Sequence, residues 1–259
     1  MIDNQLIIIK IGGNVVDNPT VLNQVLDDFA RIPSRKILVH GGGKIADVLL
    51  KKLNIEPQKI EGRRITDEDT LDVVTMVYAG LINKKIVAQL QARECNAMGL
   101  TGADLNAILA HKRTKGTIDY GFAGDIDAVN TEGVAALLNI AQTLVFAPIT
   151  HDKNGQLLNT NADTIASALA VSLSSKFKTT LKYVFEKKGV LSDVNDDNSV
   201  ISNINFDDFQ KGKSDGTFFE GMIPKLDNAF DAMKNGVQSV VICGVEGIND
   251  DIGTQLSLD

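Results

Sequence analysis

Two stretches, LIIIKIGG at residues 6–13 and ILVHGGGK at residues 37–44, each join an apolar, β-branched run to a glycine-rich turn. A segment of helical periodicity follows each turn, which is the strand–turn–helix order of an α/β fold. Backbone N–H groups in such a turn, together with the start of the helix, can bind an anion. The two stretches therefore predict two phosphate-sized loops. Neither is a Walker A motif, because the sequence Gly-x-x-x-x-Gly-Lys-Ser/Thr does not occur in the chain.

The remaining chain alternates apolar runs of strand length with helical segments, which predicts a three-layer α/β sandwich with a mainly parallel central sheet. We expect strands at residues 5–10, 36–40, 143–147, 180–185 and 238–243. We expect helices at residues 19–32, 44–53, 67–92, 131–141, 163–174 and 222–235. Glycine-punctuated residues 100–130 predict hairpins that could cover a site, and Asp152–Gly155 predicts a further hairpin turn.

Length allows one large α/β domain or two lobes around a cleft, because the chain has 259 residues, 44% of them hydrophobic. We expect two lobes, residues 1–176 and residues 177–259, joined by a packed hinge near residues 174–178.

Composition argues against several partners. The net charge is −7 and no Lys/Arg stripe carries interleaved aromatic residues, so we do not expect a nucleic-acid partner. The N-terminal segment lacks the basic start of a signal peptide, and no segment approaches the roughly 20 apolar residues that span a bilayer. Cys95 and Cys243 lie far apart in the sequence and outside any Cys/His cluster. These features predict a reduced, cytoplasmic protein with no membrane partner.

Two lysines lie at predicted strand or helix ends, where their positive charge could stabilise a transferring phosphoryl group. Lys10 lies at the C-terminal end of the first predicted strand, the edge at which open α/β sheets bind ligands. Lys225, in the segment Gly221–Lys225, lies at a predicted helix start. Each lysine is suited to stabilising a phosphoryl group. Each could instead be a solvated surface residue.

Two further motifs suggest roles beyond local structure. Arg63 and Arg64 precede a predicted helix start, where an arginine fork can bind a carboxylate bidentately, although surface arginines are common there. The segment Asn159–Asp163 places several polar side chains at the start of an apolar helix, more than capping alone requires. His40, His111 and His151 form no spaced metal set.

The second glycine stretch also has a rival interpretation. Gly41, Gly43 and Ala46 satisfy the loose dinucleotide pattern G-x-G-x-x-G/A, with Glu61 about twenty residues further on. An NAD-binding oxidoreductase is therefore an alternative. A tight turn that needs glycine for conformational reasons alone is another.

Taken together, these motifs resemble the amino acid kinase superfamily and, within it, the N-acetylglutamate kinases. The markers cover essentially the whole chain: Lys10–Gly13, His40–Gly43, Gly62–Thr66, Asn159–Asp163, Gly221–Lys225 and Gly253–Thr254. The resemblance implies the two-lobed amino acid kinase fold and phosphorylation of the γ-carboxylate of an N-acylated glutamate by MgATP, on the route to arginine. It implies substrate binding and dimerisation in residues 1–176 and ATP binding in residues 177–259.

Residue roles also follow from the resemblance. It implies that Lys10 and Lys225 stabilise the transferring phosphoryl group, while Asp163 holds both lysines in position. Substrate would contact the backbone of Gly42 and Gly43 and the side chains of Arg64 and Asn159. ATP would contact seven residues: Gly12, Gly13, Glu186, Lys187, Gly189, Leu191 and Met222. Magnesium would be held mainly by ATP phosphates and water, so no metal site of the protein itself is expected.

Three departures from the family pattern bear on specificity. Phe185–Gly189 replaces a usual Thr-Asp or Ser-Asp pair, and Glu220 replaces a common glycine. Gly99–Asp104 and Gly121–Asp125 differ where the acyl group would be enclosed. The acyl group is therefore expected to be acetyl or a variant, for which N-succinyl, with its extra carboxylate, is the case to test.

Other interpretations stay open at this point. Another kinase of the superfamily, such as a glutamate 5-kinase or a carbamate kinase, is one. A nucleotide-binding regulator without turnover on the same fold is another. Because only about four residues precede the first predicted strand, the resemblance further predicts an arginine-insensitive homodimer.

Overall fold

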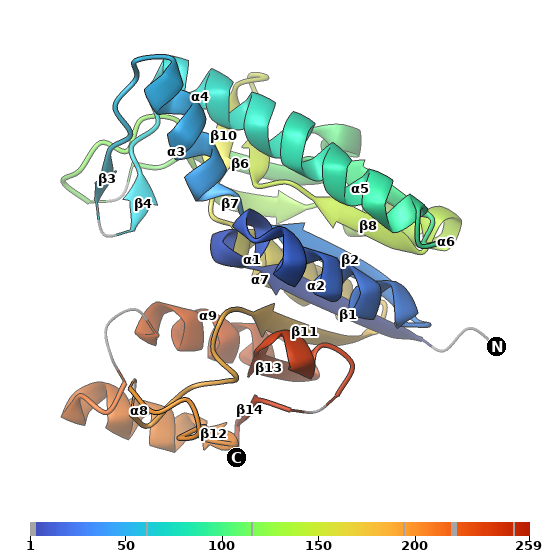
Figure 1. The fold of residues 1–259 in the computed structure, drawn as a ribbon, viewed down its shortest axis with the longest axis vertical. Helices are drawn as coiled ribbons and strands as arrows, with labels where there is room; N and C mark the ends of the chain where they lie inside the picture. The colour runs from blue at the N-terminus through green and yellow to red at the C-terminus, as the bar shows by residue number, and fades with distance from the viewer. Residues whose placement is uncertain (1–3, 61, 115, 194, 219–221, 251) are drawn as a thin grey trace.

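The computed structural model describes residues 4–60, 62–114, 116–193, 195–218, 222–250 and 252–259. Its centre is a sheet with the strand order β12-β14-β13-β11-β1-β2-β8-β5 (Figure 1). The inner strands are β1 (Gln5–Ile11), β2 (Arg35–His40), β8 (Thr143–Phe146), β11 (Lys178–Val184), β13 (Ser239–Cys243) and β14 (Thr254–Ser257), and the edges are β5 (Ala97–Leu100) and β12 (Asn203–Asn205). All neighbours pair in parallel except β13 and β14.

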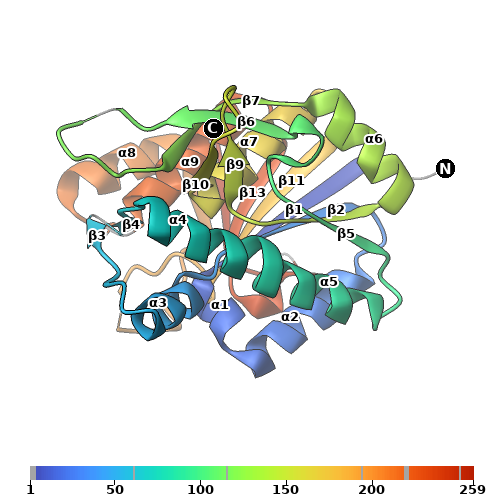
Figure 2. The same cartoon turned by 90° about the horizontal axis from the view of Figure 1, so that it is seen from above.

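Helices cover both faces of this sheet. One face carries α1 (Gly13–Asp17), α2 (Pro19–Arg31), α3 (Gly43–Lys52), α4 (Glu68–Thr75) and α5 (Asn83–Gln91), as Figure 2 shows. The other carries α6 (Thr131–Ala141), α7 (Ala162–Leu173), α8 (Phe206–Asp215) and α9 (Ile223–Lys234). The predicted fold class, an α/β sandwich with a mainly parallel sheet, is confirmed.

The alternation of side chains along β1 explains how one strand serves both faces. Leu6 and Ile8 belong to the core under α6 to α9, whereas Ile9 and Ile11 belong to the core under α1 to α5. Successive residues of a strand point to opposite faces. Lys10 therefore points to the side of α7 and α9.

Smaller strands complete the fold. Four form a closed barrel beside the main sheet: β6 (Ile108–Lys112), β7 (Ala123–Val129), β9 (Ile149–His151) and β10 (Leu157–Thr160). The antiparallel pairs β6–β7 and β9–β10 confirm the hairpins predicted for residues 100–130 and around Asp152–Gly155. β3 (Lys59–Ile60) and β4 (Arg63–Arg64) form a two-stranded ribbon. Two short 3-10 turns, Asp104–Asn106 and Val245–Gly247, lie in connections.

The helix predicted at residues 67–92 differs in its interior. Its middle, Met76–Ile82, is a π-helix between α4 and α5. The helix begins with Asp67 as its N-cap, whose side chain accepts a hydrogen bond from the backbone of Thr70 at 2.9 Å.

The sheet runs through the expected lobe boundary without interruption. β11 starts directly after it and pairs with β1 from Gln5 to Ile11. The division at residues 176 and 177 stays a prediction. Among the helices that the structure describes, none combines the length and apolar character needed to cross a membrane.

Candidate functional site

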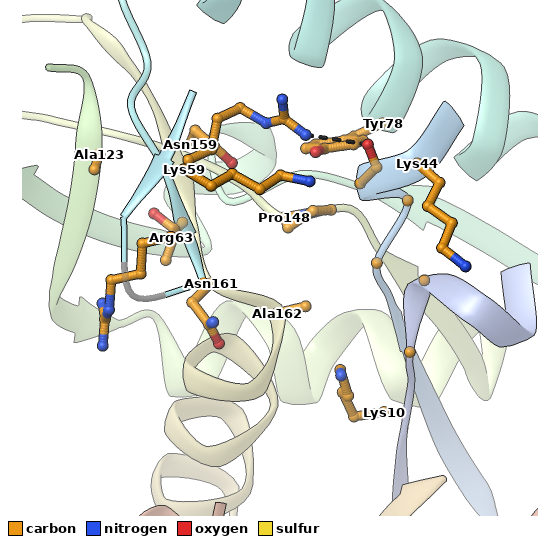
Figure 3. A pocket seen from close by; sticks show the side chains of 18 of the residues that line it. Lys10, Lys44, Lys59, Arg63, Tyr78, Ala123, Pro148, Asn159, Asn161 and Ala162 are labelled. Carbon is orange, nitrogen blue, oxygen red and sulfur yellow. Dashed lines mark hydrogen bonds between the residues drawn. The ribbon is translucent and has the colours of Figure 1, made fainter. Parts of the chain in front are cut away.

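A cavity of about 470 Å³ opens at the C-terminal ends of β1 and β2. Nine of the fourteen residues for which the sequence suggested a catalytic or binding role line it: Lys10, Gly12, Gly13, Gly42, Gly43, Arg64, Asn159, Glu186 and Lys225. Figure 3 shows Lys10 rising into this space from β1, with Lys59 extending across it from the opposite side. The sheet edge thus gathers groups that are far apart in the sequence.

Asp163 is not among the residues that line the cavity, but its carboxylate contacts two that are, Lys10 and Lys225. Its two carboxylate oxygens pair with Lys10 Nζ at 2.7 Å and with Lys225 Nζ at 3.2 Å. Burial alone would raise the pKa of Asp163, but the charges of Lys10 and Lys225 outweigh it and hold the pKa below its usual value. Asp163 is therefore a carboxylate that fixes two cations at one end of the cavity.

Local structure explains why these three residues meet. Lys10 comes from β1, Asp163 from the first turn of α7 and Lys225 from the first turn of α9. Asn161 caps α7 by accepting a hydrogen bond from the Thr164 backbone at 3.1 Å, which leaves the carboxylate of Asp163 free for the lysines. Pro224 lies at the start of α9, where its fixed φ suits the first turn. Two helix N-termini thus point to the end of one strand.

The two glycine loops pack against each other because β1 and β2 are parallel neighbours. A Cβ on Gly41 would lie 3.2 Å from the Gly13 nitrogen, and a Cβ on Gly42 would lie 2.2 Å from Ile82 Cδ1. A side chain at Gly42 would therefore require Ile82 to move. The Gly12 N–H donates to the Val184 carbonyl at 3.3 Å, so in this conformation it is already engaged. The first N–H groups of α3, which begins at Gly43, have no acceptors within the helix.

Arg64 is held from two sides at the opposite end of the cavity. Its guanidinium pairs with Asp47 at 2.6 Å and donates to the Gly43 carbonyl at 3.0 Å. Lys59 pairs with the same carboxylate at 2.5 Å. Burial would raise the pKa of Asp47, but Lys59 and Arg64 together lower it below its usual value. Because a guanidinium has five N–H donors, Arg64 keeps donors for a ligand after making these two contacts.

Asn159 is oriented by the loop that precedes α4. Its Nδ2 donates to the Thr66 hydroxyl at 3.0 Å, and its backbone N–H donates to the Phe122 carbonyl at 2.9 Å. Gly121 contacts the same loop so closely that a Cβ there would lie 2.1 Å from the Thr66 carbonyl oxygen. The Asn159 side chain is therefore fixed where it lines the cavity.

Four residues predicted to bind ATP lie outside this cavity. Lys187 pairs with Asp197 at 2.6 Å, and Gly189 packs against Thr254 and Val200. Leu191 forms an isolated β-bridge, and Met222 is buried at the start of α9. Their role stays a prediction. Glu61, Glu220 and Gly221, which belong to the motifs described above, lie outside the described residues.

Several cavity residues were not predicted from the sequence. Lys44 and Lys59 carry charges toward it, Tyr78 reaches it from the π-helix, and Arg113 reaches it from the end of β6. Lys44 directly follows the glycines, so its position was a usable signal. Arg113, which pairs with Asp125, had none, because only the closure of the small barrel brings β6 to this edge.

His40 lies beneath the second glycine loop and is fully buried. Its Nδ1 lies 2.9 Å from the Gly41 carbonyl and its Nε2 lies 3.3 Å from Asn83 Nδ2. Burial lowers the pKa of His40 to about 4, with the Gly41 contact acting weakly in the opposite direction. A neutral ring that donates to Gly41 and accepts from Asn83 satisfies both contacts. His40 therefore supports the loop and carries no charge near neutral pH.

The described residues contain no group of three or more His, Cys, Asp or Glu side chains that could hold a metal ion. Glu186 is the carboxylate among the residues that line the cavity, and it accepts a hydrogen bond from the side chain of Asn14. A single carboxylate does not fit a magnesium ion held by the protein alone.

Known proteins resemble this chain over nearly its full length. Residues 5–244 match the profile of the Amino acid kinase family. A relative from Cytophaga hutchinsonii named acetylglutamate kinase is 55% identical, covering 97% of this chain and 98% of its own. Relatives of the same name from Bacteroides fragilis and Methanopyrus kandleri are 51% and 36% identical, over 97% and 95% of this chain.

Solved structures agree on the fold. A Streptococcus mutans protein superposes with a TM-score of 0.81 at 27% identity, covering 98% of this chain and 99% of its own. Carbamate kinase from Giardia lamblia bound to AMP-PNP gives a TM-score of 0.74 at 14% identity, with both chains fully covered. At that identity the likeness shows the fold alone. From its profile match, its relatives and its fold, this chain belongs to the amino acid kinase family.

Proposed function

We propose that this protein transfers the γ-phosphoryl group of ATP to the γ-carboxylate of N-acetyl-L-glutamate, forming an acyl phosphate in arginine biosynthesis. Relatives that are 50–55% identical and carry the name acetylglutamate kinase support this reaction. The observation that carries the proposal is the cluster of Lys10, Asp163 and Lys225 beside two glycine loops.

The chemistry requires positive charge and alignment. A carboxylate is ionised at neutral pH, so the acceptor needs no general base. The barrier lies in bringing one anion to another, and charge spreads over the phosphoryl oxygens as transfer proceeds. Lys10 and Lys225 would stabilise that charge from two sides, and Asp163 would keep them separated and oriented. Backbone N–H groups of the Gly42–Gly43 loop would align the reacting groups.

The other end of the substrate would meet Arg64 and Asn159. Arg64 would pair with the α-carboxylate through donors that Asp47 and Gly43 leave unused. Asn159, fixed by Thr66, would hydrogen-bond the same end of the molecule. This arrangement places the two carboxylates of glutamate at opposite ends of the cavity.

ATP would enter from the side of the C-terminal region. Gly12, Gly13 and Glu186 line the cavity there, and we assign Lys187, Gly189, Leu191 and Met222 to the more distant part of the nucleotide. Magnesium would arrive bound to ATP phosphates and water, since the cavity lining does not fit a protein-held ion. We also infer a cytoplasmic homodimer that binds neither nucleic acid nor membrane.

An acidic acyl group is a second candidate, favoured by the charge of the cavity. Arg63, Lys59 and Arg113 line it in addition to Arg64. N-acetylglutamate offers only an α- and a γ-carboxylate, whereas N-succinylglutamate adds a third. The additional cations would suit that third carboxylate.

The test is an acyl phosphate assay with hydroxylamine trapping. Purified protein and MgATP are incubated separately with N-acetylglutamate, N-succinylglutamate and free glutamate. We expect product from an N-acylglutamate, and the better of the two acyl substrates names the acyl group. Lys10→Ala should lower turnover by roughly 10²- to 10³-fold, as loss of one oxyanion-stabilising donor does. Lys178→Ala, which removes an exposed lysine at the other end of the sheet, is the matched control.

Three results would contradict the proposal. Product from free glutamate alone would indicate another kinase of the family. ATP binding without product from any substrate would favour a nucleotide-binding regulator. Full activity in Lys10→Ala would remove the lysine from catalysis. The NAD-binding alternative is set aside, because the second glycine stretch lies within residues 5–244, which match the Amino acid kinase family.

A further inference from the structure

Tyr78 lines the cavity but has no part in the reaction proposed above. It lies in the π-helix Met76–Ile82, and only 5% of its surface is exposed. Figure 3 shows this side chain at the end of the cavity to which Lys59 extends. A π turn is rare and is frequently found at functional sites. The position of Tyr78 therefore calls for a reason beyond helix packing.

The π segment forms a floor under the second glycine loop. Its wide turn is closed by a hydrogen bond from the Asn83 N–H to the Tyr78 carbonyl, five residues apart. The side chain of Asn83 also contacts His40, which lies beneath the loop. A Cβ on Gly42 would lie 3.3 Å from Cδ1 of the Tyr78 ring. The π turn thus holds the Tyr78 ring against the loop that would align the reacting groups.

Packing explains the ring of Tyr78 but not its hydroxyl, because a phenylalanine ring would make the same contact with Gly42. Burial raises the pKa of Tyr78, and Arg64 partly opposes this through its charge and through a hydrogen bond. A guanidinium only donates hydrogen bonds. Arg64 therefore uses a lone pair of the hydroxyl oxygen and leaves the hydroxyl proton unused. Tyr78 is a protonated donor beside the guanidinium.

The carboxylate that neighbours this pair already has two partners. One oxygen of Asp47 pairs with Arg64 at 2.6 Å, and the other pairs with Lys59 at 2.5 Å. The hydroxyl of Tyr78 and the remaining N–H groups of Arg64 are therefore two donors at the same end of the cavity. An anion with two oxygens, such as a carboxylate, can accept from two neighbouring donors at once.

We propose that the Tyr78 hydroxyl donates a hydrogen bond to the α-carboxylate of the N-acylglutamate, beside Arg64. One carboxylate oxygen would accept from Arg64 and the other from Tyr78. The inference rests on the proposed function, because it takes this substrate as the occupant of the cavity. It adds a binding residue that recognises the charge of the α-carboxyl group.

The experiment is a calorimetric titration of the full chain and of Tyr78→Phe with N-acetyl-L-glutamate and N-succinyl-L-glutamate, and with the α-amide of each. We expect Tyr78→Phe to weaken binding of the better acid at least about tenfold, which corresponds to roughly 1.4 kcal/mol. Binding of its α-amide should change less, because a hydrogen bond to a charged acceptor is roughly twice as strong as one to a neutral acceptor. Tyr120→Phe, at an equally buried tyrosine that does not line the cavity, is the matched control.

Titration with ADP is the folding check, and its affinity should be the same in all three proteins. Equal affinity of the parent and Tyr78→Phe for both acids would overturn the inference and leave the hydroxylamine assay unaffected. Equal weakening for the acids and their α-amides would overturn it too, because the hydroxyl would then support the cavity without contacting the carboxylate. A parent protein that binds neither acid would instead overturn the proposed function, and this inference with it.

Discussion

At the scale of single residues, buried titratable groups set how the site responds to pH. Asp163 and His40 are both buried, but their environments act in opposite directions on charge. Asp163 keeps its charge because two lysines contact it. His40 is neutral near pH 7 because burial disfavours the charged ring, and the contact with the Gly41 carbonyl only partly opposes this. The second glycine loop thus packs on a neutral ring, while Lys10 and Lys225 at one end of the cavity pair with a charged carboxylate.

The pKa of His40 predicts an acid sensitivity of the fold. The folded pKa is about 4 and the unfolded pKa is about 6.5, so between these values the unfolded chain binds more protons. Stability present above about pH 6.5 is therefore lost as the pH falls toward 4, by up to about 3 kcal/mol. Urea unfolding between pH 7.5 and 4.5 checks this.

The control for that measurement is His40→Gln, which keeps a polar side chain and cannot titrate. Its stability should fall less steeply with acid than that of the parent. Identical slopes for the two proteins would show that other groups cause the loss.

At the scale of elements, the contact between the second glycine loop and the π-helix sets the shape of the site. Gly42→Ala would place a methyl group 2.2 Å from Ile82 Cδ1 and 3.3 Å from the Tyr78 ring. We expect a loss of stability of roughly 1–3 kcal/mol, the usual cost of overpacking. Gly80→Ala in the π-helix is the control, because a Cβ there has nothing within 4 Å. Thermal unfolding of both variants measures this loss, and equal melting temperatures would contradict the predicted clash between residue 42 and Ile82.

The sequence predicted elements well where hydrophobic period and turn chemistry act locally. All five expected strands are present, as are the helices begun by Pro19 and Asn161. The interior of the helix at residues 67–92 could not be predicted, because nothing in its periodicity marks the π turn that brings Tyr78 to the cavity. Short strands such as β14 and the edge strand β12 form only because neighbouring strands offer hydrogen bonds.

The prediction of site residues likewise succeeded where the signal is local in the sequence. Lys10, the glycines, Arg64 and Lys225 stand at element ends, which the sequence reveals. Arg113 reaches the cavity through the closure of the small barrel, and Lys59 through the ribbon of β3 and β4, whose position over the cavity depends on tertiary packing. Local rules cannot supply such distances.

At the scale of the whole molecule, the continuous sheet ties the expected lobes together. β1 is hydrogen-bonded to β2 on one side and to β11 on the other, across the boundary at residues 176 and 177. We expect residues 1–176 and 177–259 to unfold in one cooperative transition. Differential scanning calorimetry should give a calorimetric enthalpy equal to the van't Hoff enthalpy. Two separate heat-absorption peaks would show that the lobes are independent.

The central place of β1 also has a consequence for synthesis on the ribosome. This strand is synthesised first, whereas one of its two neighbours, β11, consists of residues 178–184. Until those residues emerge, one edge of β1 has unpaired N–H and C=O groups, and such an edge is a template for pairing with other chains. β1 therefore lacks one of its two neighbouring strands through most of translation, and the central sheet is completed only when the last third of the chain has been synthesised.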